Sequence, residues 1–216
     1  MVNWLTINSV FLDLDGTLLD LHFDNHFWLE HVPVCYAERH GLDHAEARSV
    51  LNDKYAAVMG SLDWYCVEYW SKELELDIPQ LKKDVSHKIA VRPSVEEFLE
   101  FLHMQGKRVV LVTNAHPASV SIKMKKTSLD RYFNRIISSH ELRLAKEEQG
   151  FWEKLQQTEP FDAEKTLFID DNFGVLDAAK DYGIKNLLAI KKPDSRGDEK
   201  KHHEYVLLDS FEQITK

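Results

Sequence analysis

The sequence of 216 residues lacks the features that would place it in several special classes of protein. No stretch approaches the roughly 20 consecutive apolar residues that a membrane-spanning helix needs. The N-terminal stretch has no basic segment followed by an apolar one, as a secretory signal would. Glycine and proline are sparse, at 8 and 6 residues, which excludes collagen-like and low-complexity chains. We therefore expect a globular protein of the cytosol with no membrane partner.

Cysteine is also scarce, since the sequence contains only Cys35 and Cys66. Both lie in apolar, aromatic-rich stretches. Without an export signal, a disulfide framework is not expected. We predict two reduced thiols that pack as small hydrophobic groups.

Positive charge is in deficit, because 27 lysines and arginines face 36 acidic residues and the formal net charge is −9. That balance argues against a nucleic-acid polymer as partner, which would need a basic surface. It remains compatible with a small phosphate substrate, for which one cation and one lysine suffice locally. The length allows one α/β domain, or one such domain that carries a smaller inserted one.

Six short apolar runs predict the strands of one sheet. They are nearly continuous in Val, Ile, Leu and Phe, as strands buried on both faces should be. Helical patterns alternate with the later runs, for example at residues 172–182. The alternation predicts a doubly wound, Rossmann-like parallel sheet. The six runs are residues 9–14, 107–113, 135–139, 166–170, 185–190 and 204–208.

One interval, between residues 20 and 90, contains helical patterns but no strand pattern. It is too long for a simple connection between a strand and a helix. We predict an α/β core of residues 1–20 and 91–216, with residues 21–90 as a helical cap above the first strand. The expected cap helices are residues 23–39, 45–59, 64–74 and 80–90. The polar stretch 191–203 is expected to form an exposed loop, and its Arg196-Gly197-Asp198 triplet to be a chance match.

Two acids, Asp13 and Asp15, follow the first predicted strand, and Gly16 and Thr17 then turn the chain. Residues two apart on a strand point to the same side, so both carboxylates can converge at the carboxyl edge of the sheet. Burying such a pair is costly unless it is charge-paired or binds a metal. For Asp15-Gly16 alone, an ordinary turn would be the simpler interpretation.

Polar residues also end the other predicted strands. Thr113-Asn114 follows the second strand, Lys146 comes after the third, and Asp170-Asp171 ends the fourth. Hydroxyl, amide and ammonium groups suit phosphate oxygens. Because parallel strands end at one edge, we expect these residues to meet Asp13 and Asp15 there.

This pattern resembles the haloacid dehalogenase-like superfamily over essentially the whole chain, with Asp-Leu-Asp-Gly-Thr at residues 13–17 as its most specific string. The resemblance implies that Asp13 is a nucleophile and that a phospho-aspartyl intermediate forms on it. It implies that Asp15 is the general acid and base. It also implies a Mg²⁺ ion held by Asp13, the Asp15 backbone carbonyl and Asp171, with Asp170 bound directly or through water.

The resemblance implies that Thr113 and Lys146 hold phosphoryl oxygens, and Asn114 is a further candidate for the substrate phosphate. Lys146 precedes Glu147, whereas proline is frequent there in the superfamily. Other lysines on the preceding helix are therefore rivals, although we expect them on a solvated helix face. These rivals are Lys123, Lys125 and Lys126.

The fourth motif also departs from the common pattern. Val175 stands where many members of the superfamily carry a further acid, so Asp170 and Asp171 are left to complete the metal site. Asp177 is expected to belong to the helix that follows.

The cap is unusually aromatic, and most of its rings are expected to form the core of a helical bundle. His22, Asn25 and Trp28 directly follow the catalytic loop and could reach a substrate. His22 and His26 lie one helical turn apart, but no third ligand is evident, so a metal pair is not expected.

Within the superfamily, the chain resembles the bacterial purine mononucleotidases that hydrolyse GMP and IMP. The similar segments are residues 19–28, 63–70, 113–117, 166–171 and 193–195. This resemblance implies hydrolysis of purine nucleoside 5′-monophosphates. A sugar-phosphate or phosphoglycolate phosphatase stays open as an alternative. A phosphomutase, a dehalogenase and a non-catalytic binding module are disfavoured, the last because all four motif acids are present.

Overall fold

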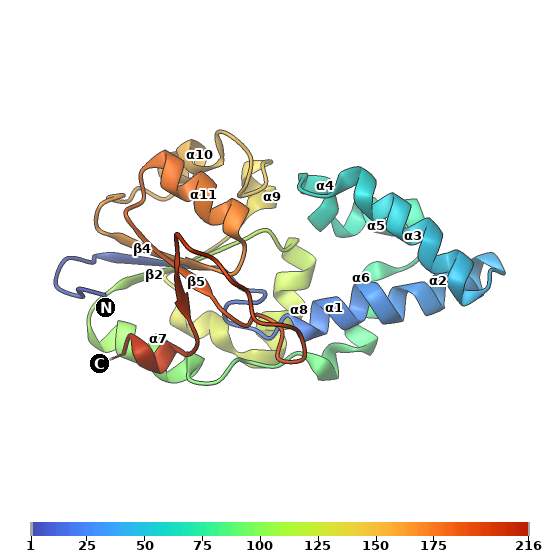
Figure 1. The fold of residues 1–216 in the computed structure, drawn as a ribbon, viewed down its shortest axis with the longest axis horizontal. Coiled ribbons are helices and arrows are strands. Elements are labelled where there is room, and N and C mark those ends of the chain that lie inside the picture. Colours follow the sequence, from blue (N-terminus) through green and yellow to red (C-terminus); the bar gives the residue numbers. More distant parts are fainter. Residues whose placement is uncertain (1, 216) are drawn as a thin grey trace.

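The computed structural model describes residues 2–215 and is built around a six-stranded parallel sheet (Figure 1). The strand order is β3-β2-β1-β4-β5-β6, and every neighbouring pair is parallel. Every predicted run forms a strand, with bounds that differ from the prediction by at most two residues, and the predicted fold class is confirmed. The strands are β1 (Ser9–Leu12), β2 (Arg108–Thr113), β3 (Arg135–Ser138), β4 (Thr166–Asp170), β5 (Asn186–Ile190) and β6 (Val206–Leu208).

Helices cover both faces of the sheet. Successive residues of β1 point to opposite faces, and each face packs against a different pair of helices. Phe11 packs in a core with residues of α10 (Phe151–Thr158) and α11 (Phe173–Tyr182). Val10 and Leu12 point to the opposite face, where α7 (Val95–Met104) and α8 (Pro117–Thr127) contribute to a second core. Because both faces are buried, the strands carry continuous apolar runs.

The strand order places β1 and β4 side by side at the centre of the sheet. The chain leaves β1 toward β2 on one side and leaves β4 toward β5 on the other. In doubly wound sheets this reversal opens a crevice at the carboxyl ends of the two strands. Leu12 pairs with Ile169 there, so the acids that follow each strand emerge next to each other.

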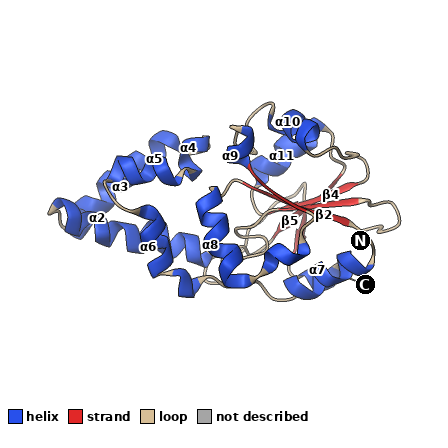
Figure 2. Cartoon of the chain, turned by 180° about the vertical axis from the view of Figure 1, so that it is seen from behind, coloured by secondary structure: helices blue, strands red, loops and turns tan. Residues whose placement is uncertain are grey.

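Residues 22–88, called the helical insertion below, contain helices and no strand in the structure (Figure 2). Its first helix runs without a break over residues 22–40, although its middle is π-helical. Pro33 has no N–H for the carbonyl four residues earlier, which accounts for the irregular turn before it. The elements are α1 (His22–His26), η1 (Phe27–His31), α2 (Val32–His40), α3 (His44–Val58), α4 (Leu62–Tyr65), α5 (Val67–Leu74), α6 (Ile78–Asp84) and η2 (Ser86–Lys88).

Two predicted helices of this region were wrong in their bounds. The helix expected over residues 64–74 is broken at Cys66, whose sulfur accepts the backbone N–H of Tyr69 and so begins a new helix. The helix expected over residues 80–90 starts earlier, because the Asp77 side chain caps it by accepting from the Gln80 N–H. It then ends at Asp84.

The helical insertion joins the sheet through two adjacent chain segments. Leu19 and Val91 form an antiparallel bridge, and the Asp20 N–H donates to the Ala90 carbonyl at 2.9 Å. Short elements complete the fold: η3 (Leu129–Tyr132), α9 (Ser139–Leu142) and η4 (Phe211–Gln213). Within residues 2–215, no helix has the length and apolarity needed to cross a membrane.

Candidate active site

Asp13 lies one residue beyond β1 and continues its pairing, since its N–H donates to the Ile169 carbonyl at 3.0 Å. Its side chain is buried. Gly16 turns the chain with a φ of +87°, and a Cβ at this position would lie 2.8 Å from the Asp171 side chain. Glycine is therefore required for two reasons, namely the left-handed backbone and the close approach of Asp171.

Lys146 bridges the acids that follow β1 and β4. Its ammonium group lies 2.6 Å from both Asp13 Oδ1 and Asp170 Oδ2, and the side chain is only 2% exposed. Its backbone N–H donates to the Asn114 side chain, which fixes the loop that carries it. Burial alone would lower the pKa of Lys146, but the two carboxylates outweigh burial and raise it. The structure thus brings Lys146 to the rim where the sequence predicted it.

Lys123 does not lie on a solvated helix face, and that prediction was wrong. It is 1% exposed, and its ammonium group lies 2.6 Å from Asp15 Oδ1 and 2.7 Å from Asp24 Oδ2. The neighbouring Lys125 and Lys126 are exposed, as predicted. Lys123 is buried because two carboxylates compensate its charge.

The Asp15 carboxyl is set in a strongly perturbed environment. Burial raises its pKa to about 7, the charges of Asp24 and Asp13 add to this shift, and Lys123 opposes it. A carboxyl group in this range can both give and accept a proton near neutral pH. The environment of Asp15 is therefore suited to acid–base chemistry.

Asp24 extends this charge arrangement into the helical insertion. Its second oxygen accepts a hydrogen bond from Lys82 at 3.0 Å, and Lys82 is buried above the ring of Phe27. Burial of Asp24 would raise its pKa, but Lys123 and Lys82 outweigh burial and hold it far below the usual range. A chain of alternating charges consequently runs from the sheet into the insertion.

Three carboxylates meet beside Lys146. Asp13, Asp170 and Asp171 each offer one oxygen, and these oxygens lie within 4.8 Å of one another. Burial and the neighbouring charge of Asp13 raise the pKa of Asp170, although Lys146 opposes the shift. Lys200 approaches the group from outside and donates to Asp171 Oδ2 at 2.8 Å. An all-oxygen set of this kind suits a hard divalent cation.

Thr113 and Asn114, at the end of β2, are buried at the same edge. The Asn114 side chain donates to Glu147 at 2.8 Å. Glu147, which stands where proline is frequent in the superfamily, also accepts a hydrogen bond from the Tyr65 hydroxyl at 2.8 Å. Since Tyr65 belongs to α4, this bond joins the helical insertion to the loop that holds Lys146.

These groups line one cavity of about 340 Å³. Five aspartates and four lysines surround it, so its formal charge is close to neutral. Its acids and bases are Asp13, Asp15, Asp24, Asp170, Asp171, Lys82, Lys123, Lys146 and Lys200. The wall on the insertion side is aromatic, made by Trp28, Tyr55, Trp64 and Tyr65. The cavity thus has a charged floor and an aromatic wall.

The three residues of the insertion predicted to face a substrate behave differently. Trp28 and Asn25 line the cavity, and Asn25 also donates to Asp194 at 2.6 Å. His22 is not among the residues that line it and lies 3.8 Å from Asp194 instead. Asp194 belongs to the polar stretch 191–203, which was expected to be an exposed loop. This stretch is partly packed against the site, whereas its Arg196-Gly197-Asp198 triplet is exposed.

The remaining predictions concern residues at the margin of the site. Asp177 lies within α11, as expected, and accepts a hydrogen bond from Tyr205. Val175 is buried and lines the cavity. Cys35 and Cys66 are free thiols, as predicted, and both are half-buried. Each sulfur also lies near a polar side chain, His31 for Cys35 and Glu68 for Cys66.

Several residues of the site were missed by sequence reasoning, and Lys123 could have been found. Val120, Lys123 and Met124 lie on the buried face of α8 at helical spacing, so Lys123 occupies the apolar stripe. Asp24, Lys82 and Lys200 carry no comparable signal. Their partners come from distant parts of the chain.

Comparisons with known proteins find relatives that match most of the chain. The family model of haloacid dehalogenase-like hydrolases matches residues 7–183. GMP/IMP nucleotidase YrfG of Escherichia coli is 37% identical over 99% of this chain and 96% of its own length. A phosphoglycolate phosphatase of Pseudomonas fluorescens is 26% identical over 82% of this chain and 66% of its own. The crystal structure of a HAD phosphatase from Thermococcus onnurineus superposes with a TM-score of 0.80 at 21% identity, over 96% of each chain.

Proposed function

The chain belongs to the haloacid dehalogenase-like hydrolase family, and from that premise we propose that it hydrolyses purine nucleoside 5′-monophosphates to nucleoside and phosphate. The observation that carries the proposal is the cavity in which Asp13, Asp15 and Lys146 meet an aromatic wall. Charged groups on its floor suit the phosphate, and flat rings on its wall suit a base.

Asp13 is the nucleophile in this proposal. Its oxygen attacks phosphorus in line with the ester oxygen, which forms an aspartyl phosphate and releases the nucleoside. Lys146 holds one Asp13 oxygen at 2.6 Å and compensates negative charge, so that a phosphate dianion can approach. Thr113 and Asn114 line the same cavity as Asp13 and bind phosphoryl oxygens in this proposal.

Asp15 is the general acid and base. It protonates the leaving ester oxygen, and in the second step it takes a proton from the water that hydrolyses the aspartyl phosphate. We assign Lys123 as its positioning residue, because the ammonium group holds Asp15 Oδ1 at 2.6 Å. This pairing restricts the carboxyl to one orientation while its raised pKa keeps a proton available near neutral pH.

The residues present fit a Mg²⁺ ion. Asp13, Asp170 and Asp171 supply carboxylate oxygens within 4.8 Å of one another, and the backbone carbonyl of Asp15 is the fourth oxygen of the proposal. When bound, the ion compensates the charge that phosphate brings among these acids. Lys200 donates to Asp171 in the structure and would give up that contact to the ion.

We further propose that residues 21–90 act as a cap, with residues 1–20 and 91–216 as the catalytic core. The insertion supplies the aromatic wall and thereby selects the substrate. The nucleotidase relative shares more identity, over more of the chain, than the phosphoglycolate phosphatase. The four aromatic residues of this wall also fit a purine better than a two-carbon acid.

The test is phosphate release from GMP, IMP, AMP, ribose 5-phosphate and phosphoglycolate, each with and without Mg²⁺. We expect turnover that depends on Mg²⁺ and that is fastest with the purine nucleotides. If GMP and IMP react no faster than ribose 5-phosphate, the nucleotidase proposal is wrong. If chelation of Mg²⁺ leaves the rate unchanged, the metal assignment is wrong.

A further inference from the structure

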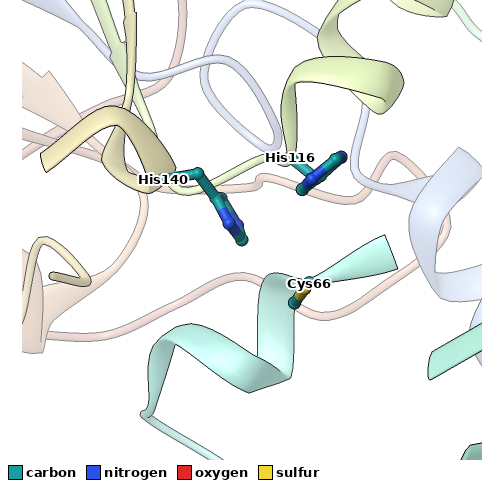
Figure 3. A group of neighbouring side chains, drawn as sticks. All are labelled: Cys66, His116 and His140. Atoms are coloured by element: carbon teal, nitrogen blue, oxygen red, sulfur yellow. The ribbon is translucent and has the colours of Figure 1, made fainter. Parts of the chain in front are cut away.

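A second group of metal-ligating side chains lies where the helical insertion meets the sheet side of the molecule (Figure 3). Cys66 lies between α4 and α5, His116 begins α8 directly after β2, and His140 lies in α9 after β3. One ligand atom from each residue lies within 4.8 Å of the others. The two imidazole rings are 4.7 Å apart, and Figure 3 shows the thiol approaching them from the opposite side.

Both imidazole rings are half-buried at this boundary. Burial lowers the pKa of His140 to about 4, and it lowers the pKa of His116 as well, although Glu68 opposes that shift. The His140 Nε2 atom is buried and has no hydrogen-bond partner among residues 2–215. A buried ring nitrogen without a hydrogen-bond partner is available to bind a metal ion.

Glu68 adds a fourth candidate ligand. One of its oxygens lies 2.6 Å from His116 Nε2 and 3.7 Å from the Cys66 sulfur. Its side chain is 70% exposed, so it can turn toward an ion without disturbing the core. One thiolate, two imidazoles and one carboxylate make up a donor set that is common for Zn²⁺.

We propose that Cys66, His116 and His140, with Glu68 as fourth ligand, bind a thiophilic divalent cation such as Zn²⁺. This donor set differs from the aspartates beside Lys146, which offer only oxygen. Mg²⁺ prefers oxygen ligands, so the two sites select different ions.

The geometry indicates a reversible site. Zinc bonds of about 2.0–2.3 Å bring tetrahedral ligand atoms to roughly 3.3–3.8 Å from one another, so ligand atoms up to 4.8 Å apart must approach each other by as much as about 1.5 Å. His116 must also give up hydrogen bonds with Glu68 and with the Ala118 N–H. These losses oppose binding and make the ion exchangeable.

A bound ion would link two parts of the molecule. Cys66 and Glu68 belong to the helical insertion, whereas His116 and His140 belong to the sheet side, and His116 lines the cavity. The link would hold the insertion against the cavity and slow the exchange of substrate and product. This consequence rests on the proposed function, whereas binding of the ion does not.

Binding is tested by titrating the Mg²⁺-saturated protein with Co²⁺, which takes the place of Zn²⁺ and reports its ligands by absorption. We expect one equivalent to bind with a thiolate-to-cobalt charge-transfer band. Cys66→Ser should lose the band, and His140→Gln should weaken Co²⁺ binding by about 10-fold or more. Cys35→Ser is the matched control, because Cys35 is also a half-buried thiol of the insertion. Absence of the band in the wild type, or its persistence in Cys66→Ser, overturns the proposal.

A second measurement covers variants that fail to fold. In the wild-type protein, Zn²⁺ should slow alkylation of Cys66 but not of Cys35, and equal rates with and without Zn²⁺ would contradict the site. The link is tested by Zn²⁺ inhibition at saturating Mg²⁺, which should be at least about 10-fold weaker in Cys66→Ser than in Cys35→Ser. Equal inhibition of both variants overturns the link. The Co²⁺ titration needs no substrate, so its outcome is independent of the proposed function.

Discussion

Two ion clusters line the cavity, and they differ in how they depend on the helical insertion. The core cluster, defined as Asp13, Lys146 and Asp170, comes from the end of β4 and from loops beyond β1 and β3, with no residue of the insertion. The bridging cluster, defined as Asp15, Lys123, Asp24 and Lys82, has its first two residues on the sheet side and its last two in the insertion. Asp13, the proposed nucleophile, is therefore held by the core alone, whereas Asp15, the proposed general acid, is held through Lys123, which also contacts the insertion.

The difference has an energetic side. Removing one partner of a buried ion pair leaves an uncompensated charge, which typically costs about 3–5 kcal/mol. In the core cluster, the loss of one partner destabilises the carboxyl edge of the sheet. In the bridging cluster it also weakens the contact between the insertion and α8. The predictions below separate the two clusters, and they run from the largest expected effect to the smallest.

Asp13→Asn removes the nucleophile from the core cluster. We expect kcat to fall by about 10⁴-fold or more for every phosphate ester, since no other group can form the covalent intermediate. Single-turnover phosphate release measures the loss. Asp198→Asn is the matched control, because Asp198 is exposed in the 191–203 stretch. An Asp13→Asn protein that folds and keeps the wild-type rate would show that covalent catalysis through Asp13 is wrong.

Lys123→Met breaks the bridging cluster and leaves the core cluster intact. A nucleoside is a poor leaving group that needs a proton, so we expect kcat with GMP to fall by about 10²-fold. p-Nitrophenyl phosphate has a good leaving group, and its kcat should fall much less. Lys126→Met, on the exposed face of the same helix, is the control. Equal losses with both substrates would indicate a structural role for Lys123 and contradict its assignment to Asp15.

Trp28→Leu changes the aromatic wall without removing a charge from either cluster. Loss of stacking against a base should raise KM for GMP by about 10-fold, in line with roughly 1–3 kcal/mol per stacked base. KM for ribose 5-phosphate should stay nearly constant, because that substrate has no base. Steady-state kinetics with both substrates measure the ratio. An unchanged ratio would remove Trp28 from the base site.

Tyr65→Phe deletes the hydroxyl that binds Glu147 across the cavity mouth. One lost hydrogen bond is worth about 1 kcal/mol, so kcat/KM should fall about 5-fold while the stability of the sheet stays unchanged. Tyr69→Phe provides the control from the next helix, since no hydrogen bond of the Tyr69 hydroxyl is found among residues 2–215. If both variants behave alike, the contact between Tyr65 and Glu147 does not contribute to catalysis.

The core cluster could be predicted from the sequence, whereas the bridging cluster could not. Asp13, Lys146 and Asp170 follow strands whose apolar runs are unmistakable, and parallel strands must end at one edge. Their position therefore follows from local pattern and topology together. Asp24 and Lys82 lie on two helices of the insertion, and the packing of those helices is set by many side chains at once. No spacing rule brings these two residues together.

The error on Lys123 has a specific cause. Lysine is rarely buried without a partner, so three lysines on one helix indicate a solvent-exposed helix face. The partners of Lys123 are Asp15 and Asp24, about 100 residues away in the chain. The apolar stripe of α8 carried the correct signal, and the general rule for lysine overrode it. The helix break at Cys66 was missed for a different reason, because a helix cap formed by a cysteine sulfur has no common sequence signature.

The bridge between Leu19 and Val91 has a consequence for evolution and engineering. The chain enters and leaves the helical insertion at neighbouring points, so whatever lies between them can change in length or sequence without moving any strand. Selection can then alter the range of substrates by editing one interval, while the residues that transfer phosphate stay in place. For the same reason, exchanging residues 22–88 between relatives offers a direct way to transplant specificity onto this catalytic sheet.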